Sequence, residues 1–541
     1  MAEPVRARTD LPGEGSGRSA RDNPGDWIPF LDWREVFPGN RGVDRHGVYN
    51  LFDAPVGIAL QVEPSEPSEP LLVVEQPWED PANMQPSATW RDEEDGSYGI
   101  IYAGRDGTIC LARSPDGYQF HRPALGQAEW SGSRANNILA DGPTNGILLD
   151  PTAPPEERYK GLGQEGGYFD PLTGEKLDSR EGEARQREME QGGPGYRGPQ
   201  AEMRHWVVAW VSPDRLHWTR VERPAAPFPS DGGNRPQYDQ ATDTYFDYVR
   251  VHGRDPETPR GIGTGIPERS IGRRSIGLMR TRDFFDWSPP KLVIYPTPQD
   301  AADVSFYGAN YSRYPGREDL HLLFLQVYHQ NSDQIDDQLA VSWDGLIWYR
   351  HHEPIIPRGP LGSGYEGMCR TFAGGIVELP DGWWAVSHEC NPGLHNRGGY
   401  RHFRELIANP AAADAITLKP HEPASIRWAR WRPHRLCGID TALEGRFTTQ
   451  TIRRSRDELR LNYRCASGGF IEVELVRLVA GRLQPDMDGL PGFTFAECDR
   501  LTGDAIDRVV TWRGRHDIAG IGETVAVRIR MFQAKVFAYR V

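Results

Sequence analysis

The 541-residue sequence predicts an all-β fold, a five-bladed β-propeller followed by a C-terminal β-sandwich, and three observations support this prediction. The chain holds 59 Gly and 45 Pro without low-complexity runs, which is typical of many short strands joined by turns. A short pattern, Ser/Thr-x-Asp-x-x-x-aromatic, recurs along the first two thirds of the chain. From residue 436 onward, apolar and polar residues alternate strictly, as in half-buried strands.

The length allows two or three domains, and the change of pattern places their boundaries. We expect a partly irregular N-terminal extension over residues 1–45, the propeller over residues 46–435 and the sandwich over residues 436–541. Within the sandwich, the alternation is clearest from Phe470 to Val476 and from Val525 to Phe532.

The recurring pattern marks a tight turn between two strands, in which the Asp side chain caps the turn and the aromatic ring packs between adjacent sheets. Its four copies begin at Ser114, Ser212, Thr281 and Ser342. A strand, a polar turn and a second strand form a hairpin before each copy, and a fifth hairpin follows the last copy. The five hairpins are Pro86 to Tyr102, Gly146 to Leu162, Gln237 to Arg250, Asn310 to Gln326 and Phe372 to Glu389. Five inner hairpins predict five blades.

The fifth blade lacks a clear outer hairpin. We expect Ser425 to Arg432 to supply it, with help from the N-terminal segment near Val48 to Val62. Three insertions interrupt the blades, at residues 164–204, 253–274 and 391–423. Loops this long are usually functional lids or linkers, and the first is expected to hold a short helix.

Composition excludes several function classes. The net charge of −14 and pI of about 5.6 argue against a nucleic-acid partner, because phosphate binding needs a clustered basic surface. Residues 1–25 hold no signal-peptide-like apolar stretch and no long apolar run follows, so we expect a cytoplasmic protein without a membrane partner. The six cysteines are scattered without a CxxC motif, which signals neither disulfides nor zinc. No cofactor is predicted, although a structural divalent metal at the propeller axis stays open, as does the oligomeric state.

Several segments carry a family resemblance that covers most of the chain. They are Asn136 to Leu139, Leu149-Asp150-Pro151, Pro155 to Lys160, Tyr248-Val249-Arg250, Gln338 to Ser342 and Pro491-Gly492-Phe493. With these the sequence resembles bacterial proteins similar to glycoside hydrolase family 32, a clan shared with the five-bladed family 43 enzymes. The resemblance implies a carbohydrate or glycoside substrate. The Asn-Asp-Pro-Asn-like run of true family 32 members is absent, since Pro81 to Pro86 stands there, so fructosidase activity is not implied.

Chemistry is expected where the starts of first strands meet the ends of second strands around the propeller axis. The carboxylates at these positions, predicted to be catalytic, are Asp231, Asp303, Glu366 and Glu389. The predicted substrate-binding residues are Asp80, Asn83, Asn145, Asn234, Arg250, Tyr307, Asn310, His329, Arg370 and His388. Each Asp or Asn at a strand start also has a structural reading, because these residues cap turns.

Glycoside hydrolysis needs one protonated carboxyl group to aid the leaving oxygen and one ionised carboxylate as nucleophile or base. We favour Glu366 or Glu389 as the acid and Asp231 or Asp303 as the base or nucleophile. A cation such as Arg250 or Arg370 would hold one carboxylate ionised, whereas burial would raise the pKa of another.

Two alternatives to a glycosidase stay open. The same scaffold could host a lyase, isomerase or cyclase that uses His388 or His329 as a base. A non-catalytic carbohydrate-binding protein is the second. The sequence fixes neither the sugar and its linkage nor the anomeric outcome.

Overall fold

The computed structural model describes residues 26–43, 46–81, 83–170, 172, 176–192, 197–226, 233–252, 273–360, 362–372, 374–395, 423–476 and 489–541. The chain forms two compact units. One comprises Met1–Glu63 and Pro433–Val541, and the other comprises Pro64–Arg432.

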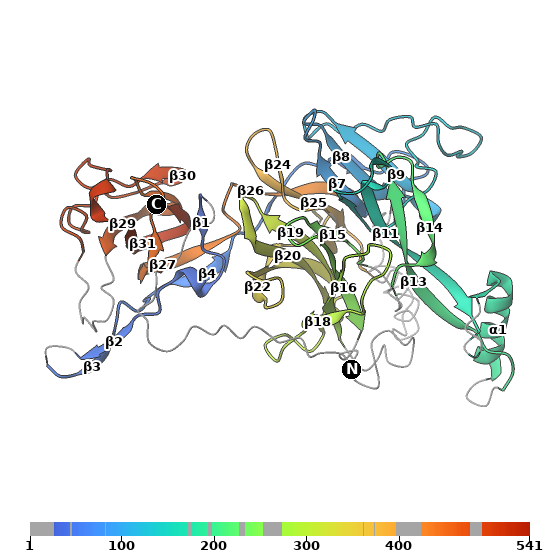
Figure 1. Ribbon diagram of the computed structural model, residues 1–541, viewed down its shortest axis with the longest axis horizontal. Helices are drawn as coiled ribbons and strands as arrows, with labels where there is room; N and C mark the ends of the chain where they lie inside the picture. The colour runs from blue at the N-terminus through green and yellow to red at the C-terminus, as the bar shows by residue number, and fades with distance from the viewer. Residues whose placement is uncertain are drawn as a thin grey trace. The chain divides into compact units, whose positions relative to one another are not determined.

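The unit over Pro64–Arg432 consists of successive blades that follow the chain order (Figure 1). Their strands pair antiparallel within each blade, and one parallel pairing, Ile335 with Met368, joins the last two blades into a ten-stranded sheet. Blade one holds β7 (Pro86–Arg91), β8 (Tyr98–Ala103) and β9 (Ile109–Ser114), with a bridge from Cys110 to Ile138 at its outer edge. Blade two holds β10 (Gly146–Leu149), β11 (Tyr159–Phe169), β13 (Glu202–Ser212) and β14 (Thr219–Pro224). Blade three holds β15 (Gln237–Asp239), β16 (Thr244–His252), β17 (Arg274–Thr281) and β18 (Lys291–Ile294).

Blade four holds β19 (Val304–Tyr314), β20 (Arg317–His329), β21 (Gln334–Ser342) and β22 (Tyr349–Ile356). Blade five holds β23 (Met368–Thr371), β24 (Val377–Glu378), β25 (Trp384–Asn391) and β26 (Ser425–Trp431). Two short strands from the start of the unit, β5 (Glu66–Pro67) and β6 (Leu72–Val73), pair with β26 and complete this blade.

Apolar side chains join each blade to the next and the last blade to the first. Separate clusters span blades one and two, two and three, three and four, and four and five. Ile100 and Tyr102 of blade one share a further cluster with Ile426 and Trp428 of blade five. These interfaces close a ring, which confirms the predicted five-bladed β-propeller.

The strand that closes the ring differs from the one expected. Val48 to Val62 was predicted to help the fifth blade, but Ala59–Val62 (β4) pairs with β27 (Cys437–Thr448) of the other unit, and Glu66–Val73 closes the ring instead. The propeller therefore begins after residue 63 rather than at residue 46. Any exposed edge can accept a strand, so local sequence did not distinguish the two edges.

The recurring Asp side chains cap their turns as predicted. Asp116, Asp214 and Asp344 each accept two backbone N–H groups at 2.8–2.9 Å through Oδ1. Trp287, the aromatic residue of the third copy, is buried between blades two and three.

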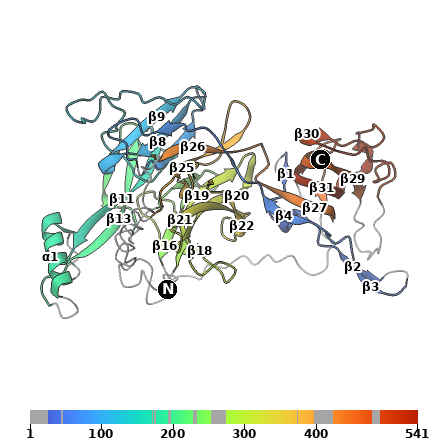
Figure 2. The same cartoon turned by 180° about the vertical axis from the view of Figure 1, so that it is seen from behind.

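The first insertion holds the expected helix. Helix α1 (Ser179–Gly192) follows β12 (Lys176–Leu177) at the far end of the long β11–β13 hairpin, as both cartoon views show (Figure 2). The other insertions lie largely outside the described residues, at residues 253–272 and 396–422. Short 3₁₀ turns are Trp33–Glu35, Arg105–Gly107, Pro155–Glu157 and Ala519–Ile521.

The second unit contains the C-terminal strands that were predicted to form a β-sandwich, and we call it the sandwich. Its main described strands pair in one seven-stranded sheet. Its main strands are β27, β29 (Arg460–Val476), β30 (Asp504–Val509) and β31 (Thr524–Arg540), and β1 (Ile28–Pro29), β4 and β28 (Ile452–Arg453) pair with them. A separate hairpin joins β2 (Asn40–Val43) and β3 (Tyr49–Phe52). The two alternating segments of the sequence pair with each other within β29 and β31 and supply much of one apolar core. Among the described residues, no helix is long and apolar enough to cross a membrane.

Candidate active site

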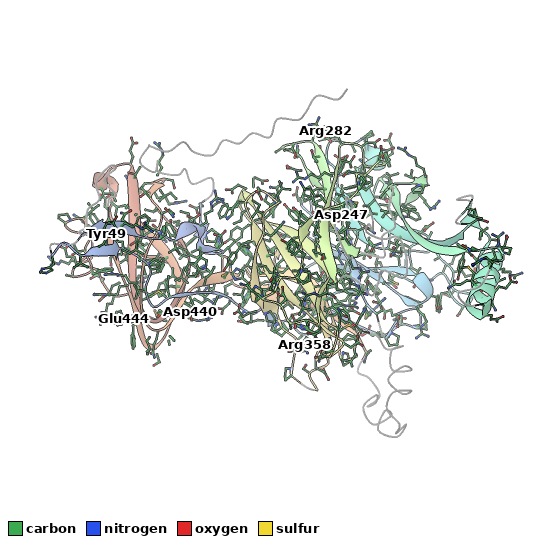
Figure 3. The ribbon with its side chains drawn as sticks, turned by 90° about the horizontal axis from the view of Figure 1, so that it is seen from below. Tyr49, Asp247, Arg282, Arg358, Asp440 and Glu444 are labelled. Carbon is green, nitrogen blue, oxygen red and sulfur yellow. The ribbon has the colours of Figure 1, made fainter. Side chains whose placement is uncertain are left out.

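Polar side chains from blades three, four and five are buried together in the propeller, and we call them the central polar cluster. Each is at most 6% exposed. The cluster comprises Asn234, Arg235, Asp247, Arg250, Asn310, Gln326, Asp337, Arg370, His388 and Glu389. Figure 3 shows Asp247 among the side chains of neighbouring strands, whereas Arg282 lies at the outer edge. Burying so many polar groups costs free energy unless they are paired, so their partners decide what the cluster can do.

Glu389 is the carboxylate of the cluster that contacts a guanidinium group. It forms an ion pair with Arg370, its register partner across β23 and β25, and it accepts the backbone N–H of Met84 at 3.2 Å. The Arg370 guanidinium also lies over the Phe372 ring, 4.8 Å from its centre.

Arg235 connects the other side of the cluster. Its backbone N–H donates to Asp247 at 2.9 Å, and its guanidinium donates to the carbonyl of Ala309 and lies over the Phe372 ring at 5.2 Å. Burial lowers the pKa of Arg235 to about 10, and the charges of Asp247 and Asp337 oppose that shift. Phe372 therefore contacts the guanidinium groups of both Arg235 and Arg370.

Two carboxyl groups of the cluster favour the protonated state. Burial raises the pKa of Asp247 to about 8, despite its hydrogen bond from Arg235. Burial also raises the pKa of Asp337 to about 7, against the hydrogen bonds that Thr371 donates to it. One oxygen of each carboxyl group has no hydrogen-bond partner among the described residues. Such a group can hold a proton at neutral pH and donate it.

Cations and aromatic rings border this cluster. Arg250 donates to the carbonyl of Tyr307 at 3.0 Å and lies 4.3 Å from the centre of its ring. His395 packs against the same ring at 4.4 Å. Burial lowers the pKa of His395 to about 3, and the positive charges of Arg370, Arg274 and Arg250 lower it further. Three guanidinium groups thus act on one imidazole, which keeps that ring neutral.

Seven predicted site residues lie in or beside the central polar cluster. They are Asn234, Arg250, Tyr307, Asn310, Arg370, His388 and Glu389. Asn310 donates to the carbonyl of Gly374 at 2.9 Å, which ties blade four to blade five.

Other predicted residues make structural contacts elsewhere. Asp303 accepts the backbone N–H of Asn331 at 3.2 Å. Glu366 accepts that of Gly362 at 3.1 Å through Oε1, whereas its Oε2 is buried without a hydrogen-bond partner among the described residues. The His329 ring contacts Asp336 at 3.1 Å, and this hydrogen bond raises the pKa of His329. The Asn145 side chain donates to the Thr144 hydroxyl at 3.4 Å. The backbone carbonyl of Asp80 accepts the backbone N–H of Asn83 at 3.2 Å.

The predicted nucleophile or base Asp231 lies outside the described residues. Of the four predicted catalytic carboxylates, the structure thus brings Glu389 alone into the cluster of described residues.

Sequence reasoning missed Arg235, Asp247, Gln326 and Asp337. Asp247 and Asp337 lie in the middle of β16 and β21, whereas candidates were sought at strand ends. A charged residue inside an apolar strand, as in Tyr245-Phe246-Asp247-Tyr248-Val249, was the available signal.

Comparisons with known proteins find distant structural likenesses. No protein-family model matches the chain, and no curated protein is similar to it in sequence. A thermostable family 43 glycoside hydrolase is 12% identical, with 59% of this chain and 87% of that chain covered and a TM-score of 0.37. A family 32 β-fructofuranosidase from Bombyx mori is 10% identical, with 87% and 94% covered and a TM-score of 0.35.

A third structure is an N-acetylgalactosamine deacetylase from F. plautii in complex with blood group B trisaccharide. It is 12% identical, with 69% of this chain and 94% of that chain covered and a TM-score of 0.36. Because identities and TM-scores are low, the function has to be inferred from this chain's own side chains.

Proposed function

We propose that the chain is a glycoside hydrolase that acts on a carbohydrate or glycoside at the central polar cluster. The observation that carries this proposal is that the cluster contains both a carboxyl group favouring its proton, Asp247, and a carboxylate paired with a cation, Glu389. Glycosidases need this division between an acid and an ionised partner.

In this proposal Asp247 donates a proton to the leaving glycosidic oxygen. Its unpartnered oxygen, Oδ2, is the atom from which the proton leaves. Glu389 serves as the nucleophile or as the base for water, because it is the carboxylate that pairs with the Arg370 guanidinium. This assignment reverses the acid role expected for Glu389.

Cations and rings beside the carboxyl groups supply the means to hold a sugar. Arg250 on Tyr307, together with Phe372 between two guanidinium groups, offers hydrogen-bond donors next to apolar ring faces. Sugars present hydroxyl groups at their rim and C–H groups on their faces, so this combination suits them.

Turnover of aryl glycosides and oligosaccharides by the purified chain tests the proposal. We expect Glu389→Gln and Asp247→Asn each to lower kcat by about 10²–10⁴-fold. Asp381→Asn is the matched control, because Asp381 lies in an exposed hairpin turn where it accepts the Tyr118 hydroxyl at 2.8 Å. Undiminished turnover in both cluster variants would overturn the assignment.

Product analysis in ¹⁸O-labelled water separates the alternatives. Hydrolysis places one solvent oxygen in the products. Products without solvent oxygen would instead indicate a lyase, isomerase or cyclase, and sugar binding without turnover would indicate a binding protein.

A further inference from the structure

Two cysteines and a histidine meet inside blade five. Cys369 on β23 stands opposite Cys390 on β25, and His388 lies two residues before Cys390 on the same face of β25. All three side chains are at most 2% exposed. Their ligand atoms lie within 4.8 Å of one another, and this is the one such group of His, Cys, Asp or Glu among the described residues.

The donor set suits a thiophilic metal ion. The Cys390 sulfur lies 3.1 Å from Nε2 of His388, and Cys369 donates to the carbonyl of Tyr365 at 3.6 Å. Zinc binds Cys sulfur at about 2.3 Å and His nitrogen at about 2.0–2.1 Å, so tetrahedral ligand atoms lie roughly 3.5–4 Å apart. Small side-chain adjustments would bring these three groups to that spacing.

Both cysteines can supply a metal ligand only as thiolates, because the thiolate is the form that binds metals. Cys369 and Cys390 are free cysteines, so neither sulfur is held in a disulfide.

The carboxyl group of Asp337 lies near the trio formed by Cys369, His388 and Cys390. Asp337 interacts electrostatically with both His388 and Cys369. Nδ1 of His388 and Oδ1 of Asp337 are both buried without a hydrogen-bond partner among the described residues. Metal-binding histidines usually donate their second ring N–H to such a carboxylate.

We propose that Cys369, His388 and Cys390 bind one Zn²⁺ ion that cross-links β23 to β25. The ligands directly flank Arg370 and Glu389, so the ion would fix the two strands that carry this ion pair. The three ligands are positioning residues, since the ion holds the strands and takes no part in a reaction step. Zinc binds both cysteines as thiolates and the imidazole in its neutral form, so the metal replaces two protons of the trio, which leave to solvent. The proposal concerns metal binding and stands independently of the glycosidase assignment.

Metal content is the direct test. We expect the full-length protein, purified under reducing conditions, to hold about one zinc per chain by elemental analysis. After chelation, added Co²⁺ should give a thiolate-to-cobalt charge-transfer band. Calorimetry with Zn²⁺ in two buffers of different ionisation enthalpy should show release of about two protons.

Ligand variants have a matched control in the same chain. Cys369→Ser and Cys390→Ser should each weaken Zn²⁺ binding at least about 100-fold and remove the cobalt band, whereas Cys110→Ser should bind as the parent does. Cys110 is a buried free thiol in another blade.

If a variant fails to fold, the wild-type protein still tests the proposal. Zinc should raise the thermal midpoint of the wild-type protein, and a chelator should lower it. Three outcomes would overturn the proposal. They are no zinc or cobalt binding by the wild-type protein, unchanged binding in both ligand variants, and a Cys369–Cys390 disulfide in non-reducing peptide maps.

Discussion

Two glutamates of the sandwich and two aspartates of the central polar cluster are buried in different ways. In the sandwich, both oxygens of Glu472 and of Glu474 have partners: Glu472 contacts Arg500 and Arg530, while Glu474 contacts Arg528 and the backbone N–H of Phe495. In the propeller, Asp247 and Asp337 each keep an oxygen without a hydrogen-bond partner among the described residues. The arginines lower the pKa of Glu472 against burial, whereas burial raises that of Asp247 to about 8.

This difference separates a charge network that serves folding from one that favours a ligand. A buried polar atom without a partner costs roughly 1–3 kcal/mol, which a bound ligand can offset. The sandwich has no such cost at its glutamates, so we infer that its ion pairs hold strands together. Among the described residues of the propeller, Asp247, Asp336, Asp337 and Glu366 each have such an oxygen, which supports the proposal that a ligand binds beside them.

The largest effect on stability is expected in the sandwich. Arg528 is buried and contacts Asp53 at 2.6 Å as well as Glu474. Arg528→Met leaves these carboxylates buried without their cation, so we expect the free energy of unfolding to fall by about 3–5 kcal/mol. Urea titration measures this change.

The control for that variant is Arg500→Met. The Arg500 side chain is 59% exposed and contacts Glu472 at 2.7 Å. Exposed ion pairs contribute at most about 1 kcal/mol, so this variant should cost little. If Arg528→Met and Arg500→Met lowered the free energy of unfolding equally, buried and exposed ion pairs would not differ in their contribution to stability.

The carboxyl group of Asp247 in the propeller should make the stability of the protein depend on pH. Between its unfolded pKa of 3.8 and its folded pKa of about 8, Asp247 binds a proton in the folded state that the unfolded state has lost. Its contribution to stability is therefore full below pH 3.8 and is lost as the pH rises through about 8.

Asp247→Asn mimics the protonated group at every pH. We expect it to gain roughly 1–3 kcal/mol over the wild type at pH 9 and little at pH 4, measured by urea titration at each pH. Asp381→Asn is the exposed control. A constant difference across this range would show that Asp247 stays ionised in the folded protein.

Much of the fold could be predicted because its signals are local. Apolar alternation from Phe470 to Val476 and the hairpin from Pro86 to Tyr102 need only neighbouring residues, and both pair as expected. The strands that close the ring, Glu66–Pro67 and Leu72–Val73, have two residues each and show no alternation. Their pairing with β26 depends on the finished blade.

Most members of the central polar cluster that the sequence predicted lie near strand ends, whereas most of those it missed lie within strands. Arg370 and Glu389 were found at such ends, and the structure pairs them. Asp247 was missed because its neighbours within β16 read as a core strand. Cys369 and Cys390 are 21 positions apart, and only the register of β23 with β25 sets them opposite each other.

The smallest predicted effect on stability concerns Asp344 and Asp283, two carboxylates of the propeller that accept backbone hydrogen bonds. Oδ1 of Asp344 accepts backbone N–H groups of Leu346 and Ile347, both at 2.8 Å, whereas Oδ1 of Asp283 accepts that of Phe285 at 3.0 Å. We expect Asp344→Ala to cost about 1–2 kcal/mol and Asp283→Ala about half of that, by thermal or urea unfolding.

The pH dependence of this cost distinguishes a paired carboxylate from an unpaired one. Burial opposes the shift, but the backbone hydrogen bonds and Ser342 lower the pKa of Asp344 below 3.8. Its contribution is therefore present above pH 3.8 and is lost as the pH falls through the lower folded value, the reverse of Asp247. The cost of Asp344→Ala should shrink in acid while the gain from Asp247→Asn grows in alkali. The stability of Asp344→Ala minus that of the wild type should therefore fall as the pH rises, whereas the same difference for Asp247→Asn should rise. If both signed differences rose or both fell with pH, hydrogen-bond pairing would not be what separates these two carboxyl groups.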